Sequence, residues 1–149
     1  MLKQYSLWIL FLSVVFFGAE TLGFAQADPL GKNLWYNGDK KAKIQIYKAT
    51  DGKFYGKIVW LKEPDRDGKP KLDIHNNDKA RQNDPVMGLI ILKAFKKTDD
   101  THYEDGTIYD PKNGKTYSCK MTLEGDKLYV RGYIGFSLIG RTETWTKAD

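Results

Sequence analysis

The C-terminal segment contains the side chains most able to form a binding site. Along residues 141–147 one face carries Arg, Glu, Trp and Lys and the other only Thr, which is the period of a β-strand. If the face of Trp145 points into the protein, Arg141 and Glu143 must pair with each other or with a polar ligand group, because an unpaired buried charge is very costly. If the threonines point inward, the charged face is ordinary solvated surface.

Other aromatic and polar residues could join this group. Trp60 shares strand parity with residues 54, 56 and 58, so it is either a core residue or part of a cavity wall. Asp73 and Asn76 lie in a long polar segment, residues 63–86, which could act as a lid or be disordered. The complete set of candidate ligand-binding residues is Trp60, Asp73, Asn76, Tyr109, Arg131, Arg141, Glu143 and Trp145.

The sequence gives no support to catalytic or metal chemistry. His75 and His102 have no Cys or second His at a metal-ligand spacing, and the acidic residues of 63–86 lack the alternation of a calcium loop. The Ser and Thr residues have no nucleophile-elbow context, and nothing selects a pair of carboxylates as acid and base. We therefore predict a non-enzymatic protein with no catalytic residue, metal or cofactor.

Composition limits the chain to one domain and a narrow set of partners. It has 149 residues, 41% hydrophobic and 29% charged, with a formal net charge of +5. Its lysines are scattered singly and it has only four arginines, so a nucleic-acid surface is not expected. Cys119 is the single cysteine, which excludes an internal disulfide.

The N-terminus is predicted to be a secretory signal peptide. An almost uninterrupted apolar run spans residues 7–17 and is followed by Ala25-Gln26-Ala27, small residues at the spacing that a signal peptidase recognises. The run is shorter than the ~20 residues that cross a bilayer as a helix. We expect a signal peptide over 1–27, a β-barrel domain over 28–149, export to a periplasm or the exterior, and no stable membrane anchor.

The rest of the sequence has the pattern of an all-β protein. Short runs rich in β-branched and aromatic residues alternate with Gly, Asn and Asp turn clusters. Most connections are of hairpin length, which favours a single up-and-down antiparallel barrel of about eight strands over a two-sheet sandwich. One long connection, 63–86, joins the third and fourth strands and has at most one helical turn, near 78–82. The expected strands are 33–36, 41–49, 53–62, 87–97, 102–110, 115–123, 127–135 and 138–147.

Several motifs occur in the order in which one bacterial family has them. They are Lys57-Ile58-Val59-Trp60-Leu61-Lys62-Glu63-Pro64, Asp73 with Asn76, Pro85 with Gly88-Leu89, Gly106-x-Ile108-Tyr109-Asp110-Pro111-x-x-Gly114-Lys115-Thr116-Tyr117, Arg131-Gly132-Tyr133, and Gly140-Arg141 with Thr144-Trp145-Thr146. In these motifs the sequence resembles the exported family called domain of unknown function 2147. The resemblance implies a small secreted domain, grouped with lipocalin-like barrels, with no assigned role and no catalytic residues.

Two functions from different classes follow. The first is a protein that binds a small apolar or amphipathic ligand in its barrel. The alternative is a non-enzymatic envelope interaction or structural protein with a filled barrel and an unknown protein partner. Inward-facing Gly56, Gly88 and Gly132 would together leave space for a ligand, whereas bulky residues from every strand would leave none.

We predict cleavage after Ala27, because the Ala-x-Ala spacing follows a short apolar run. Amino-terminal sequencing of the exported protein should begin at Asp28. An intact Met1 in the membrane fraction would contradict this prediction.

Overall fold

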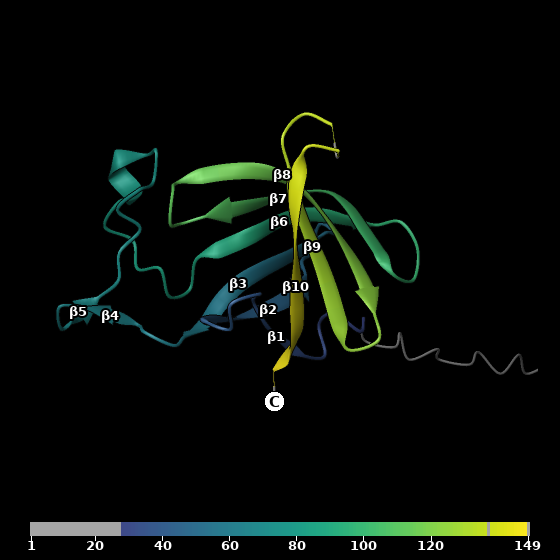
Figure 1. The fold of residues 1–149 in the computed structure, drawn as a ribbon, viewed down its shortest axis with the longest axis horizontal. Coiled ribbons are helices and arrows are strands. Elements are labelled where there is room, and N and C mark those ends of the chain that lie inside the picture. The colour runs from purple at the N-terminus through teal and green to yellow at the C-terminus, as the bar shows by residue number, and fades with distance from the viewer. Residues whose placement is uncertain (1–27, 137, 149) are drawn as a thin grey trace, which may run out of the picture.

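The computed structural model describes residues 28–136 and 138–148. Within them, eight strands close into an antiparallel barrel in the order β1-β10-β9-β8-β7-β6-β3-β2 (Figure 1). The strands are β1 Leu34–Tyr36, β2 Ala42–Lys48, β3 Phe54–Leu61, β6 Ile90–Lys97, β7 His102–Asp110, β8 Lys115–Glu124, β9 Lys127–Tyr133 and β10 Gly140–Ala148. β1 pairs with both β2 and β10, which closes the barrel. The predicted up-and-down barrel is confirmed.

The barrel has two unlike ends. We call one the mouth: it contains the turns at 37–41 and 111–114, the β9–β10 loop, and the start of the long connection after β3. We call the other the closed end: it contains residues 28–33 and the turns at 49–53, 98–101 and 125–126. The strands run alternately toward and away from the mouth, so residues late in β3, β7 and β9 and early in β8 and β10 lie there.

The long connection between β3 and β6 has its own short elements. A small hairpin pairs β4 (Asp65–Arg66) with β5 (Lys69–Pro70), and the 3-10 helix η1 spans Lys79–Arg81. Asp78 caps η1, its carboxylate accepting the Ala80 amide at 3.0 Å. The connection extends beyond the barrel at the left of Figure 1. The predicted helical turn is confirmed, and no helix in the described residues is long and apolar enough to span a bilayer.

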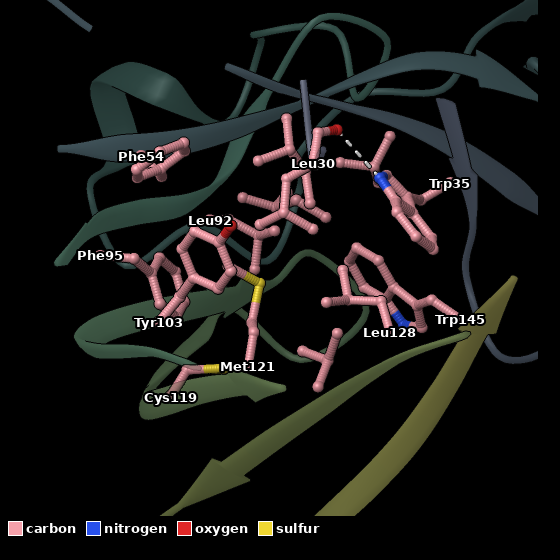
Figure 2. Close-up of a cluster of buried hydrophobic side chains, with 14 of the residues drawn as sticks. Leu30, Trp35, Phe54, Leu92, Phe95, Tyr103, Cys119, Met121, Leu128 and Trp145 are labelled. Carbon is pink, nitrogen blue, oxygen red and sulfur yellow. Dashed lines mark hydrogen bonds between the residues drawn. The ribbon is translucent and has the colours of Figure 1, made fainter. Parts of the chain in front are cut away.

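Side chains from every barrel strand fill the interior (Figure 2). The largest fully buried apolar ones include Trp35, Phe54, Phe95, Tyr103 and Trp145. The edge of the Tyr103 ring meets Phe54 at a centroid distance of 5.0 Å. Burial of such rings supplies much of the stability of a domain without disulfides.

The segment before β1 covers the closed end. Leu30 is fully buried, and its carbonyl accepts a hydrogen bond from the indole nitrogen of Trp35 at 3.1 Å. Asp28 fixes this segment to the barrel: its carboxylate accepts bonds from the Tyr103 hydroxyl at 2.8 Å, the Lys97 ammonium at 2.8 Å and the Leu30 amide at 3.0 Å. The predicted first residue of the mature chain is therefore an anchor of the fold.

Two interior glycines show how completely this space is used. A Cβ added at Gly56 would lie 2.8 Å from a Leu92 methyl carbon, and one at Gly106 would lie 2.4 Å from the Phe95 ring. These glycines admit neighbouring side chains and leave no room for a ligand. Gly88 is in the connection, where its φ of +90° suits a residue without a Cβ.

A β-bulge changes which way Trp60 points. The register of β2 and β3 shifts between Lys43 and Ile44, because Val59 is an additional residue in β3. Trp60 consequently pairs with Lys43, and its ring meets Tyr36 edge-on at 6.0 Å. This group is on the outer face, and Trp60 is 37% exposed. Both interpretations of Trp60, as core residue or cavity wall, are wrong because simple alternation does not anticipate the extra residue.

The alternation along β8 is regular, so the sequence pattern holds there. Cys119, Met121 and Leu123 are buried, as their spacing predicts. Burial raises the pKa of the Cys119 thiol to about 12. The thiol is therefore protonated at neutral pH, which makes it a packing group rather than a nucleophile.

We predict that Asp28→Asn makes stability less dependent on pH. Burial alone raises the pKa of Asp28, but the bonds from Lys97, Tyr103 and the Leu30 amide outweigh it and hold this pKa below 3.8. Such a carboxylate stabilises the folded state above its unfolded pKa, and that contribution disappears as the pH falls through the lower folded value. Near neutral pH the variant should lose about 1 to 3 kcal/mol of unfolding free energy.

Chemical denaturation at several pH values measures this effect. The difference between wild type and Asp28→Asn should shrink below pH 3.8. Asp126→Asn is the control, because that side chain is 82% exposed and should change stability by less than about 1 kcal/mol. A difference that stays constant across the acid range would contradict the role of Asp28.

Candidate functional site

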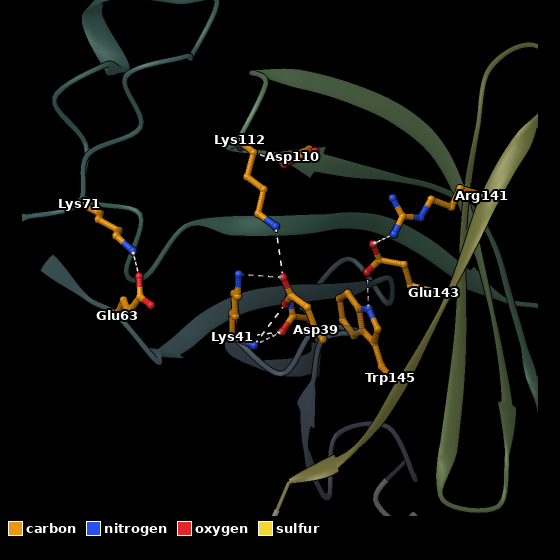
Figure 3. A network of polar contacts seen from close by, with 11 residues as sticks. Asp39, Lys41, Glu63, Lys71, Asp110, Lys112, Arg141, Glu143 and Trp145 are labelled. Atoms are coloured by element: carbon orange, nitrogen blue, oxygen red, sulfur yellow. Dashed lines mark hydrogen bonds and ion pairs between the residues drawn. The ribbon is translucent and has the colours of Figure 1, made fainter. Parts of the chain in front are cut away.

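The inner wall of the mouth carries a short column of side chains from β10. Trp145 is buried, with 2% of its surface exposed, so its face of β10 is the inward one. Above it, Glu143 accepts a hydrogen bond from the Trp145 indole at 3.3 Å and lies 3.8 Å from the Arg141 guanidinium (Figure 3). Arg141 is at the rim with 86% of its side chain exposed. Solvent exposure therefore increases along the column, from buried Trp145 to exposed Arg141.

An ion pair crosses the mouth. Lys112, in the β7–β8 turn, reaches Asp39, in the β1–β2 turn, at 3.4 Å (Figure 3). In the strand order these two hairpins lie on opposite sides of the barrel. Burial alone raises the pKa of Asp39, but the Lys112 charge and the Asn37 amide outweigh it and lower this pKa. Asp39 is therefore ionised at neutral pH, and its ion pair with Lys112 links the two hairpins across the mouth.

The wall beside the column is mostly apolar. Ile108 pairs with Tyr117 across β7 and β8, and Gly132 lies against both. A Cβ added at Gly132 would lie 3.4 Å from Ile108 and 3.8 Å from Tyr117, which are ordinary contacts. Gly132 also pairs with Arg141 across β9 and β10. Unlike Gly56 and Gly106, Gly132 could therefore carry a Cβ without a clash.

The long connection is fixed to the barrel wall and does not lie over the mouth. Asp73 is fully buried, and its carboxylate accepts hydrogen bonds from the Tyr109 hydroxyl and the Asn76 amide, both at 2.7 Å. Tyr109 alternates with inward-facing Ile108, so this contact is on the outer face of β7. Asn77 donates to the Gly114 carbonyl at 3.1 Å. Burial and the Asp73 carboxylate raise the pKa of Tyr109 to about 12.

Arg131 braces the β9–β10 loop from outside the barrel. It alternates with buried Val130 and donates to the Thr142 hydroxyl at 3.1 Å and to the Leu138 carbonyl at 3.3 Å. Its role in the fold is to hold the loop at the rim.

The eight candidate residues therefore separate into several places. Arg141, Glu143 and Trp145 meet at the mouth, whereas Asp73, Asn76 and Tyr109 meet on the outer wall, and Trp60 and Arg131 lie on other parts of the exterior. The long connection, predicted as a possible lid, instead packs against the outer wall of the barrel. Sequence reasoning missed Asp39 and Lys112, because a turn residue gives no signal of its partner across a barrel.

Two hollows lie away from the mouth. One of about 830 Å³ is at the closed end, beside Asp28 and Phe54, and one of about 380 Å³ follows the β4–β5 hairpin. Within the described residues, no three His, Cys, Asp or Glu side chains gather closely enough to hold a metal ion.

An eight-stranded antiparallel barrel of neighbouring strands, covered at one end, is a lipocalin-like fold. Protein HP1028 from Helicobacter pylori, described as belonging to the lipocalin family, superimposes with a TM-score of 0.64 at 22% identity, over 72% of this chain and 73% of that one. The sequence model of an uncharacterized protein family conserved in bacteria, DUF2147, matches residues 31–147. The chain belongs to this family, as its motifs indicated. No curated protein matches it significantly.

We predict stability losses of different size for two candidate residues. Tyr109→Phe should lower the unfolding free energy by about 1 to 3 kcal/mol, because the buried Asp73 carboxylate loses a donor. Arg141→Ala should cost less than about 1 kcal/mol, because its pair with Glu143 is at the exposed rim. Urea denaturation of each variant measures both values. A larger loss from Arg141→Ala than from Tyr109→Phe would contradict this placement of the two side chains.

Proposed function

We propose that this protein works outside the cytoplasm and binds a small amphipathic molecule at the mouth of its barrel. One observation carries the proposal: the Arg141–Glu143 pair stands on the inner wall, above the filled core and next to Gly132, where a Cβ would meet only ordinary contacts. A charged group and an apolar surface with room beside it are the two elements that an amphipathic ligand needs.

The head group would be anionic. Glu143 engages one side of the Arg141 guanidinium, and the remaining donors of this planar group can form paired hydrogen bonds with a carboxylate or phosphate. Lys112 supplies a second positive charge across the mouth. Its pair with Asp39 is largely exposed, with side-chain exposures of 74% and 39%, and such pairs are worth only about 0 to 1 kcal/mol. A ligand can therefore displace this ion pair at little cost in free energy.

The apolar part of the ligand would lie near the surface. Ile108, Tyr117 and Gly132 offer a wall for it. Deeper entry is blocked by Leu92, Trp145 and their buried neighbours. This favours a compact molecule over a long acyl chain held inside the barrel.

A second candidate function is favoured by that same filled interior. The tight contacts at Gly56 and Gly106 are what an interaction or structural protein with a solid barrel would have. Such a protein would contact its partner through its outer surface.

Titration with anilinonaphthalene sulfonate, an anionic amphipathic dye, tests the first function. Arg141→Met should weaken binding about tenfold or more, because a hydrogen bond to a charged group is worth about 1.5 to 3 kcal/mol. Gly132→Leu should abolish saturable binding by filling the mouth. Thr144→Leu is the control, since Thr144 is on the exposed face of β10, and should bind the dye as wild type does.

The result also separates the two functions. Dye binding that is absent in wild type, or unchanged in both mouth variants, would contradict the ligand site and leave the solid-barrel function. Thermal unfolding of each variant, with cooperative transitions, excludes loss of fold as the cause.

A further inference from the structure

The loop between β9 and β10 exposes a group of large apolar side chains at the rim of the mouth. The exposed fractions are 66% for Ile134, 83% for Phe136, 89% for Leu138 and 69% for Ile139. Single exposed apolar residues are normal, but a group this concentrated marks an interaction site. The loop projects from the barrel at the top of Figure 1, away from the C-terminus. Neither the ligand site nor the core uses these four side chains.

Hydrogen bonds connect several of the described residues of this loop. The Ile134 amide donates to the Ile139 carbonyl at 3.0 Å, and the Ile139 amide donates to Phe136 at 3.1 Å. The Leu138 carbonyl accepts from Arg131 at 3.3 Å. Gly135, with a φ of +65°, permits the tight turn. These bonds leave fewer backbone groups without a partner when the apolar tip leaves water.

Two arginines lie at the base of the tip. Residues 128–142 contain Arg131 and Arg141 but no Asp or Glu. Arg131 and Arg141 are on the two strands directly beneath the loop, and Glu143 lies one alternate residue deeper in the barrel. An apolar tip with arginines beneath it is complementary to the surface of an anionic bilayer. In such a bilayer the apolar acyl region lies beneath negatively charged head groups.

We propose that Ile134, Phe136, Leu138 and Ile139 insert into the interfacial region of a bilayer that contains anionic lipid. Arg131 and Arg141 then lie at the level of the head groups, and the mouth faces the membrane. The attachment is peripheral and reversible, because only a few side chains insert. This surface goes beyond the proposed ligand site, with which it shares only Arg141.

Sedimentation with vesicles of phosphatidylcholine and phosphatidylglycerol in equal parts tests the proposal. The wild-type protein should sediment with these vesicles, less with phosphatidylcholine alone, and less as salt is raised. The double variant Phe136→Ser with Leu138→Ser should weaken the partition coefficient at least about tenfold. The matched control is Ile74→Ser with Met87→Ser, since these apolar side chains, 46% and 40% exposed, lie on the long connection. This control should sediment as wild type does.

Other results would overturn the proposal. Wild-type protein that stays in the supernatant, or equal sedimentation of the two double variants, removes the tip as a membrane contact. A wild-type dimer that becomes monomeric in Phe136→Ser with Leu138→Ser, with vesicle binding unaffected, would assign the tip to a second copy of the chain. Dye titration of the Phe136→Ser with Leu138→Ser variant distinguishes the two sites. A loss of dye binding with unchanged vesicle binding would concern the mouth and not the tip.

Discussion

The width of an eight-stranded barrel limits everything else in this protein. Such a barrel has an interior that side chains of its own strands can fill, and here rings from Trp35, Phe95 and Trp145 occupy it. Gly56 and Gly106 do not create a ligand cavity, since Leu92 and Phe95 use the space that they leave. The proposed ligand site is consequently at the mouth and not inside the barrel. The same packing stabilises a barrel that has no disulfide.

The long connection illustrates how a buried charge determines the position of a loop. Asp73 is fully buried, so its carboxylate requires donors, and it finds them in Tyr109 and Asn76. Because Tyr109 faces outward from β7, these bonds hold the connection against the barrel wall. The mouth is then crossed by the exposed pair of Lys112 and Asp39, an interaction weak enough to part when a ligand enters.

The two proposed contacts share one end of the molecule but differ in polarity. The inner wall ends in Arg141 and Glu143, whereas the adjoining β9–β10 loop presents apolar side chains. A mouth held against a membrane would exchange amphipathic molecules directly with the lipid layer, without passing them through water. Arg141 belongs to both environments, since it closes the column on β10 and lies beneath the loop.

The sequence by itself determined the eight barrel strands of this protein. Period-two patterns placed the strands within a few residues, turn clusters ordered them as antiparallel neighbours, and the alternation along β8 predicted a buried Cys119. These features depend on local chain geometry, which neighbouring residues dictate. Trp60 marks the limit, because the bulge at Val59 reverses its face through pairing with another strand.

Only the tertiary structure decided which candidate residues meet. Arg141, Glu143 and Trp145 came together because they share one strand face, whose inward orientation followed from the packing of Trp145. Lys112 and Asp39 are 73 residues apart in the chain, and barrel closure alone brings them into contact. Contacts across a barrel depend on the register of every intervening strand pair, and a single bulge changes that register, so no local pattern in the sequence can specify them.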